Sequence, residues 1–433
     1  MKILFGTDYY HPSVGGLQIV IKEIAERLVK FGHQVTVATG KMTNRKSLNI
    51  NGVNIQEFDV QGSFAHGLSG KVKQYQNYIL ENKFDAFILK AAQSWTVDAL
   101  IPVLDKITMH KVFIPCGFSA LYDPFYAEYF QIMPKILRKF DHLIFYATDY
   151  RDINFARKHN ISNFSIITNG ASEKEFSTTK QIGFRDRLNI DQNDFLILNV
   201  GTFSGSKGHT ELTQAFQLAN FDQPATLLLN GNFPSVTPKV KGVKRFRYNL
   251  KSSPLNAFKQ FFTGFFNQNE SNKFSSAKPK WEEIAQAVNS KKSNKKIIIT
   301  NLSRPDVIQA YLNSDLFVFA SNIEYSPLVL FESAAARLPF LTVPVGNATE
   351  IIELTKGGLL CPAPINKNGR TRVDPQVLAK KMETLSKDRE QLIKLGKAGE
   401  ENWKKGLTWE IIAHKYEKIL EGNYNNLGLN DKN

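Results

Sequence analysis

Two carboxylates, Glu324 and Glu332, are separated by seven residues and follow an apolar run, 316–320, that is typical of a buried strand. Carboxylate oxygens can accept hydrogen bonds from paired sugar hydroxyls, as the acid of dinucleotide folds does with ribose. Glu332 lies in the otherwise apolar run 328–336, where an unpaired charge would be costly, so we expect it to have a dedicated partner. The spacing leaves two interpretations of Glu332 open: a ligand of sugar hydroxyls, and a structural group that pairs with an arginine or caps a loop.

A helix is predicted to begin between these two acids. Ser326 is a good N-cap residue, and Pro327 suits the first helical position because proline lacks the N–H group that would be unpaired there. Position 329 is Val, so no Glu or Gln closes a capping box, and the free N–H groups near Leu328 and Val329 can face an anion. This helix start therefore predicts a phosphate-binding site.

A second candidate phosphate site is the loop 201–208, which is rich in Gly and Ser and contains Lys207. It follows a predicted strand at 194–200 and precedes a helix that we expect from about Thr210. Backbone donors and the point charge of a lysine can converge there on a diphosphate. A single lysine is more often a solvated surface charge, so this loop alone does not establish a site.

The elements that would position these residues alternate between strand and helix. Strands are predicted at 2–7, 33–39, 53–58, 84–89, 111–114, 142–146 and 164–167, and again at 194–200, 225–229, 297–300, 316–320 and 357–360. Such alternation predicts parallel sheets, in which ligands bind at the carboxyl ends of the strands. Gly15 and Gly16 stand at such an end, where a backbone can approach a phosphate or sugar closely, although a Gly-Gly pair alone is more often a simple turn.

Length and composition indicate a soluble globular protein of two domains. The chain has 433 residues, of which 42% are hydrophobic and 22% charged. We predict an N-terminal domain at 1–175, a C-terminal domain at 176–405, and a crossing helix with a polar tail at 406–433. The start lacks the apolar segment of a signal peptide and no stretch is apolar enough to span a membrane, so we expect a cytoplasmic protein.

The stretch 315–352, which contains Glu324 and Glu332, resembles the Glu-x7-Glu signature of glycosyltransferase family 4, whose members are retaining enzymes of GT-B architecture. The residues that carry the resemblance are Ser321, Glu324, Pro327, Glu332, Pro339, Gly346 and Glu350. Four other parts of the chain are also similar to the family: the opening YYHPSVGG, the Asn169-Gly170 element followed by Phe176, the loop 201–208, and a last helix from Thr408. The resemblance covers both halves of the chain.

The resemblance implies an α/β fold with two Rossmann-like domains facing across a cleft and a C-terminal helix that crosses back to the first domain. It implies a hexosyltransferase-like retaining enzyme that moves a sugar from a nucleotide sugar to a glycan or lipid-linked acceptor, in surface polysaccharide or glycolipid assembly. No cofactor and no metal are implied, because the leaving diphosphate itself takes the acceptor's proton.

The resemblance also assigns roles to single residues. The catalytic roles fall to Glu324, which would orient the transferred sugar, and to Lys207, which would neutralise the diphosphate. The residues expected to bind the donor are Gly15, Gly16, Lys207, Ser326, Leu328, Val329 and Glu332, the last through the ribose hydroxyls.

Two positions depart from the family pattern. Thr202 stands where most relatives have an arginine, which removes a bidentate phosphate donor and leaves more of the charge to Lys207. Cys116 stands where many have a histidine, and we interpret it as a small buried residue because no base that would activate a thiol is visible. A degenerate GT-B protein that binds a sugar nucleotide without turnover is therefore an alternative function, and a GT-B nucleotide-sugar epimerase is a more distant one.

An insertion of unusual length is predicted at 233–295, between two strands of the second domain. The formal net charge is +15, and much of the excess falls in this region. Residues 239–266 combine Lys and Arg with phenylalanines at helical spacing, which suits an anionic membrane surface and peripheral attachment to it. The phenylalanines could equally pack on their own domain, an interpretation that we slightly favour, and a nucleic-acid surface adaptor ranks third.

Overall fold

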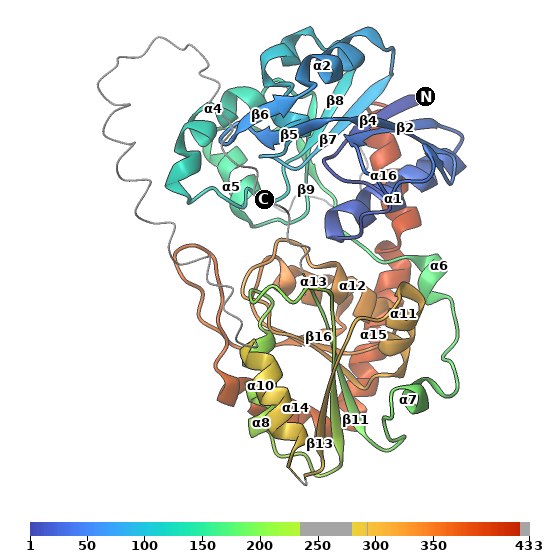
Figure 1. Cartoon of the computed structure of the whole chain (residues 1–433), viewed down its shortest axis with the longest axis vertical. Coiled ribbons are helices and arrows are strands. Elements are labelled where there is room, and N and C mark those ends of the chain that lie inside the picture. The colour runs from blue at the N-terminus through green and yellow to red at the C-terminus, as the bar shows by residue number, and fades with distance from the viewer. Residues whose placement is uncertain (234–278, 292, 425–433) are drawn as a thin grey trace.

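The computed structural model describes residues 1–233, 279–291 and 293–424, which form two α/β domains, one above the other in Figure 1. The basic and aromatic segment 239–266 of the predicted insertion lies outside the described residues. Among the helices of the described ranges, none combines the length and apolar character needed to cross a membrane.

The first domain is built on one sheet whose strands lie in the order β10-β9-β8-β7-β1-β2-β4-β3. All neighbours are parallel except the antiparallel pair β3–β4. The strands are β1 (Lys2–Gly6), β2 (Gln34–Gly40), β3 (Asn49–Ile50), β4 (Val53–Phe58), β7 (Ala86–Lys90), β8 (His110–Ile114), β9 (His142–Phe145) and β10 (Phe164–Ile166). The helical segments are α1 (Gly16–Lys30), α2 (Val72–Glu81), α3 (Trp95–Asp98), η1 (Ile101–Lys106), η2 (Pro124–Tyr126), α4 (Ala127–Leu137) and α5 (Arg151–Lys158).

The second domain is built on a parallel sheet with the order β13-β12-β11-β14-β15-β16. Its strands are β11 (Phe195–Val200), β12 (Ala225–Asn230), β13 (Lys295–Thr300), β14 (Leu316–Phe319), β15 (Phe340–Thr342) and β16 (Gly358–Leu360). The helices are α7 (Phe184–Arg187), α8 (His209–Leu218), α10 (Lys280–Asn289), α11 (Arg304–Asn313), α12 (Leu328–Ala335), α13 (Ala348–Thr355), α14 (Pro375–Lys387) and α15 (Arg389–Gly406).

Each sheet contains the topological switch point at which ligands bind in α/β folds. The strand order reverses between β1 and β7 in the first sheet and between β11 and β14 in the second. Connections at such a point leave in opposite directions, so a crevice opens at the carboxyl ends of the two strands. The loops that leave these four strands carry Gly15–Gly16, residues 91–93, the loop 201–208 and residues 321–327, which are therefore expected to surround any ligand.

The C-terminal helix α16 (Trp409–Leu420) crosses back and packs against α1, as predicted (Figure 1). Its apolar face, including Trp409, Ile412 and Tyr416, belongs to the same buried cluster as α1 and the first sheet. Just before it, a parallel bridge between Ala171 and Thr408 holds together the two segments that pass between the domains. The two domains are thus joined by two adjacent connections.

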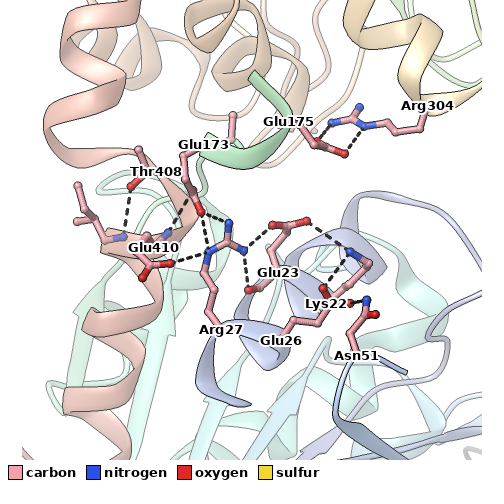
Figure 2. A network of polar contacts seen from close by, with 12 residues as sticks. Lys22, Glu23, Glu26, Arg27, Asn51, Glu173, Glu175, Arg304, Thr408 and Glu410 are labelled. Atoms are coloured by element: carbon pink, nitrogen blue, oxygen red, sulfur yellow. Dashed lines mark hydrogen bonds and ion pairs between the residues drawn. The ribbon is translucent and has the colours of Figure 1, made fainter. Parts of the chain in front are cut away.

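A set of ion pairs surrounds this junction (Figure 2). Arg27 of α1 is only 4% exposed, and it pairs with Glu23 at 2.6 Å, with Glu410 of α16 at 3.5 Å, and with Glu173 of α6 (Glu173–Phe176). Two residues further along α6, Glu175 pairs at 2.6 Å with Arg304 of the second domain. The short helix α6 therefore gives one carboxylate to each domain.

The structure corrects three details of the predicted elements. Helix α12 begins at Leu328 with Pro327 in the N-cap position, so Ser326, which was predicted as the N-cap, precedes the cap and makes no capping hydrogen bond. Residues 280–289, assigned to the insertion, instead form α10, whose buried Trp281 and Ile284 cover the second sheet as an ordinary crossover helix would. The hairpin of β5 (Val60–Ser63) and β6 (Gly67–Gly70) was not predicted, because its short, glycine-containing strands show little apolar alternation.

Candidate active site

A cavity of about 510 Å³ lies between the two domains at both switch points. The first domain lines it with Gly16, Leu17, Val20, Lys90, Ala91, Ala92, Gln93, Pro115, Cys116, Ser119, Tyr146 and Asn169. The second domain lines it with Val200, Gly201, Thr202, Lys207, Phe319, Glu324, Tyr325, Ser326, Pro327, Leu328 and Val329. Most of the residues predicted to bind a donor therefore come together in one place.

Lys207 and Glu324 form an ion pair in the second-domain wall of the cavity. The Lys207 Nζ atom is 2.5 Å from Glu324 Oε1, which also accepts a hydrogen bond of 3.1 Å from the Ser321 hydroxyl. Gly208 makes this approach possible: its φ is +69°, and a Cβ atom there would lie 1.8 Å from the Ala320 carbonyl oxygen. Only glycine lets the loop 201–208 lie this close to the end of β14.

The start of α12 is the second polar feature of this wall. Ser326, Pro327, Leu328 and Val329 all line the cavity, which places the unpaired N–H groups of the first helical turn beside it. The Ser326 carbonyl accepts a 3.0 Å hydrogen bond from the Asn169 side chain, whereas the Ser326 hydroxyl has no partner among the described residues. These groups could together receive an anion.

The two glycines at the start of α1 occupy different positions. Gly16 lines the cavity, and a Cβ atom there would lie 3.9 Å from Leu328 Cδ1 of the second domain. Gly15 is the N-cap of α1, does not line the cavity, and would bring a Cβ atom within 2.5 Å of Gln18 Oε1. Gly16 is therefore the glycine that faces the ligand space directly.

Glu332 is 5% exposed and does not line the cavity. Its carboxylate is 2.6 Å from the Arg304 guanidinium, which also pairs with Glu175. The structural interpretation of Glu332, an ion pair with an arginine, is thus present in this structure. A role in holding ribose stays a prediction, and it would require Glu332 to serve Arg304 and the ligand together.

On the first-domain wall, Lys90 and Gln93 were not identified from the sequence. Lys90 ends the strand AFILK, and a lysine closing an apolar strand at a switch point is the signal that could have revealed it. Ala91, Gln93 and Cys116 have φ values of +72°, +65° and +60°, which are rare for residues other than glycine. Backbone strain of this kind clusters at functional sites.

The two departures from the family pattern both line the cavity. The Thr202 hydroxyl donates a 3.3 Å hydrogen bond to the Asn232 side chain and brings no charge to the site. Burial raises the pKa of the half-buried Cys116 thiol to about 11, so the thiol is neutral at physiological pH. This is consistent with the interpretation of Cys116 as a small packing residue rather than a nucleophile.

The first domain also contacts the loop that carries Glu324. The Tyr150 hydroxyl donates a 2.6 Å hydrogen bond to the Glu324 carbonyl, and the Tyr146 N–H donates one of 2.9 Å to the Tyr325 hydroxyl. The rings of Tyr150 and Tyr325 are stacked with centroids 4.6 Å apart. Sequence reasoning missed these tyrosines, because interdomain aromatic contacts leave no local pattern.

Two α/β domains with parallel sheets share one cavity at their switch points, and the lysine, the carboxylate and the helix start in its wall form an arrangement that could receive a phosphate-containing ligand. Within the described ranges, no three His, Cys, Asp or Glu side chains are grouped so as to hold a metal ion.

Comparison with known proteins gives the family. The family described as glycosyl transferases group 1 matches residues 181–402, and this chain belongs to it. Assignment to family 4 and a function for the Glu-x7-Glu spacing stay predictions. A sequence search of curated proteins finds no match.

Solved structures of GT-B glycosyltransferases share the fold, which confirms the predicted architecture. Sucrose-phosphate synthase from Thermosynechococcus elongatus aligns with a TM-score of 0.68 and 17% identity, covering 97% of this chain and 98% of that one. HepE from Anabaena, in complex with UDP and glucose, aligns with a TM-score of 0.64 and 16% identity over 98% and 100%. WaaG, a glycosyltransferase involved in lipopolysaccharide biosynthesis, aligns with a TM-score of 0.61 and 16% identity over 97% and 100%.

Proposed function

We propose that this glycosyltransferase moves a sugar from a nucleotide-sugar donor to an acceptor hydroxyl with retention of the anomeric configuration. The observation that carries the proposal is the contact between Lys207 and Glu324 beside the start of α12, in the cavity between the domains. Structures of HepE with UDP and with UDP-glucose make UDP-sugars the first donors to test.

The geometry suggests how the donor would be held. A diphosphate seated against the N–H groups at Leu328 and Val329 would compete with Glu324 for the Lys207 ammonium group. Once released, the Glu324 carboxylate could accept hydrogen bonds from hydroxyls of the transferred sugar. On donor binding, Lys207 would therefore change its partner from Glu324 to the diphosphate, and Glu324 would change its partner from Lys207 to the sugar.

The chemical step needs charge stabilisation above all. The bond between the anomeric carbon and the diphosphate oxygen breaks with its electron pair going to the diphosphate, and the acceptor oxygen bonds to the same face of the sugar. The acceptor's proton passes to the leaving diphosphate. Lys207 and the helix start stabilise the charge that develops on the diphosphate, so the scheme includes neither a metal nor a cofactor.

The acceptor class and the place of action stay predictions. A glycan or lipid-linked acceptor is implied by the family resemblance, and peripheral attachment to the inner face of a membrane was expected from residues 239–266, which lie outside the described part of the chain. WaaG is involved in lipopolysaccharide biosynthesis, which makes assembly of a surface glycolipid the first pathway to test.

The proposal is tested with a panel of UDP-, GDP- and ADP-sugars, by thermal shift and by slow donor hydrolysis, on the wild type, Lys207→Met and Glu324→Gln. One sugar nucleotide should stabilise the wild type and be hydrolysed. Lys207→Met should weaken its binding at least tenfold, because a charge-assisted phosphate contact of about 1.5–3 kcal/mol is lost. Glu324→Gln should mainly slow hydrolysis. The anomeric configuration of the released sugar, followed by NMR, tests retention.

Lys296→Met is the matched control. Lys296 lies at the amino end of β13, whereas Lys207 follows the carboxyl end of β11 in the same sheet. The Lys296 ammonium group donates to the Asn189 carbonyl. This variant should bind and hydrolyse the donor as the wild type does. Donor binding without turnover in the wild type would favour the degenerate alternative, and an affinity unchanged in Lys207→Met would refute the site.

A further inference from the structure

Lys90 is a buried cation without a counter-charge in the wall of the cavity. Its side chain is 1% exposed, and its Nζ atom makes one hydrogen bond, of 3.3 Å, to the Leu17 carbonyl oxygen. The Tyr146 ring lies 5.5 Å away, and no carboxylate pairs with Lys90 in the ranges that the structure describes. An ammonium group has three N–H donors, so at least part of its hydrogen-bonding capacity remains free.

Other buried cations of the described chain are better satisfied. Arg27 and Arg185 pair with carboxylates, and Arg151 donates to the carbonyls of Ser119 and Asn368 and lies over the Tyr122 ring. A buried charge without such partners is destabilising. Burial accordingly lowers the pKa of Lys90 to about 8, so the group is still mostly protonated at neutral pH.

Cys116, which lines the same wall of the cavity, does not supply the missing charge. The Cys116 thiol is neutral at physiological pH because burial raises its pKa to about 11. The other first-domain residues around this part of the cavity, such as Ala91, Ala92 and Pro115, are uncharged. The first-domain wall therefore presents one positive charge in an otherwise uncharged surface.

Lys90 comes from a different domain than the proposed diphosphate site. It ends β7 of the first sheet, whereas Lys207 and the start of α12 belong to the second domain. In the proposed function, which this inference extends, the diphosphate lies against the second domain, and we place the acceptor against the first-domain wall that faces it. Lys90 is thus placed on the acceptor side.

We propose that Lys90 binds a negatively charged group of the acceptor, so that this enzyme takes an acceptor bearing a phosphate or a carboxylate rather than a neutral sugar. The anion would accept the hydrogen bonds that remain free on the ammonium group and would neutralise its charge. Lys90 is then a specificity-determining residue, because a neutral acceptor would leave the buried cation unpaired.

The experiment measures thermal shifts of the wild type, Lys90→Met and Lys111→Met with inorganic phosphate, glucose, glucose 6-phosphate and glucuronate. Phosphate compounds, glucuronate or both should stabilise the wild type more than glucose does, and their apparent affinity should fall at least tenfold in Lys90→Met. The phosphate and carboxylate arms distinguish the two anions. Without ligand, Lys90→Met should melt about 2–4 °C above the wild type, because it removes an unpaired buried charge.

Lys111→Met is the control, since Lys111 lies at the opposite end of the neighbouring strand β8 and pairs with Asp141. It should respond to anions as the wild type does. Equal anion responses in wild type and Lys90→Met, or no preference for anions over glucose in the wild type, would overturn the inference. Loss of nucleotide-sugar binding in Lys90→Met would also overturn it, by placing Lys90 on the donor.

These outcomes are separable from those of the proposed function. If no sugar nucleotide binds the wild type, the proposed function fails, whereas the anion measurements on Lys90→Met use no donor and still give a result. If a donor binds and is hydrolysed while the anions show no dependence on Lys90, only the inference fails.

Discussion

At the scale of single residues, the buried carboxyl group of Asp98 is the clearest source of pH dependence. It accepts hydrogen bonds from the Tyr129 hydroxyl at 2.9 Å and from the Phe64 N–H at 2.7 Å. Burial nevertheless raises its pKa to about 7, and the nearby Asp8 carboxylate adds to the effect. The folded state therefore holds a proton on Asp98 that the unfolded state releases near pH 4, and stability falls as pH rises from about 4 to about 7.

Replacing Asp98 by Asn should remove this loss. The amide oxygen can accept from the Phe64 N–H, and the amide nitrogen can donate to the Tyr129 oxygen, which reverses the second hydrogen bond and leaves the Tyr129 O–H without this acceptor at either pH. The gain in free energy of unfolding should be larger at pH 8 than at pH 5 by about 2 kcal/mol, as measured by urea titration. Asp105→Asn is the control, because Asp105 is largely exposed. Its effect on the free energy of unfolding should be the same at pH 8 as at pH 5. Equal gains at both pH values would contradict the assignment.

Some residues of the cavity wall could be singled out from the sequence and others could not. Lys207 and Glu324 were singled out because their loops resemble motifs of a known family; the structure brings both to the cavity wall, and their roles stay predictions. Lys90 could not be singled out, because a lone lysine usually indicates a solvated surface. Arg304 was expected only as an unnamed partner of Glu332, since the sequence shows that a buried carboxylate needs a cation but not which one.

At the scale of elements, the two connections between the domains are packed tightly at Gly170. A Cβ atom there would lie 2.2 Å from the Leu407 carbonyl oxygen and 2.6 Å from Ile412 Cδ1. The next residue, Ala171, donates a 3.1 Å backbone hydrogen bond to the same carbonyl. The absence of a side chain at Gly170 thus allows the start of α16 to lie against the first connection.

Gly170→Ala should therefore destabilise the protein by about 1–3 kcal/mol, because the clash involves backbone that cannot rotate away. Gly406→Ala is the matched control: Gly406 ends α15, and nothing lies within 4 Å of the position that its Cβ would take. Alanine there should be neutral or slightly stabilising. Thermal unfolding of both variants checks this, and equal melting temperatures would show that the junction tolerates the extra methyl group.

Most elements could be predicted, since buried strands and amphipathic helices carry their own periodicity. The predicted strand at 53–58 is β4 as found, and the helix predicted from about Thr210 is α8, which begins at His209. The start of α12 was placed one residue early, because Ser and Pro satisfy the N-cap and first-turn preferences in either register. How α6 distributes its two carboxylates between domains depends on tertiary structure, which no local pattern encodes.

At the scale of the whole molecule, a second set of contacts joins the domains on the side of the cavity. Glu350, in the first turn of α13, accepts backbone hydrogen bonds from Thr148 at 2.9 Å and Asp149 at 3.1 Å. Asn347 donates a 3.0 Å hydrogen bond to the Tyr146 carbonyl. These contacts hold the two cavity walls at their present separation.

Glu350→Ala should shift the molecule toward a more open arrangement. Two hydrogen bonds to a charged group are lost, each of which contributes about 1.5–3 kcal/mol, so the population of open molecules should rise at least tenfold. Small-angle X-ray scattering should show a larger radius of gyration than for the wild type. Glu353→Ala, on the exposed side of the same helix, should leave the radius unchanged. A radius for Glu350→Ala equal to that of the control would mean that the junction alone fixes the arrangement.

Helix α16 also constrains the order in which the protein can form on the ribosome. The first domain's strands end at Ile166, yet residues 409–420 cover part of the apolar core that those strands and α1 create. While the second domain is being synthesised, that surface has no covering helix and is available to chaperones. We expect arrested nascent chains to gain protease resistance in residues 1–166 only after α16 has emerged, so that the first domain synthesised is not the first to be completed.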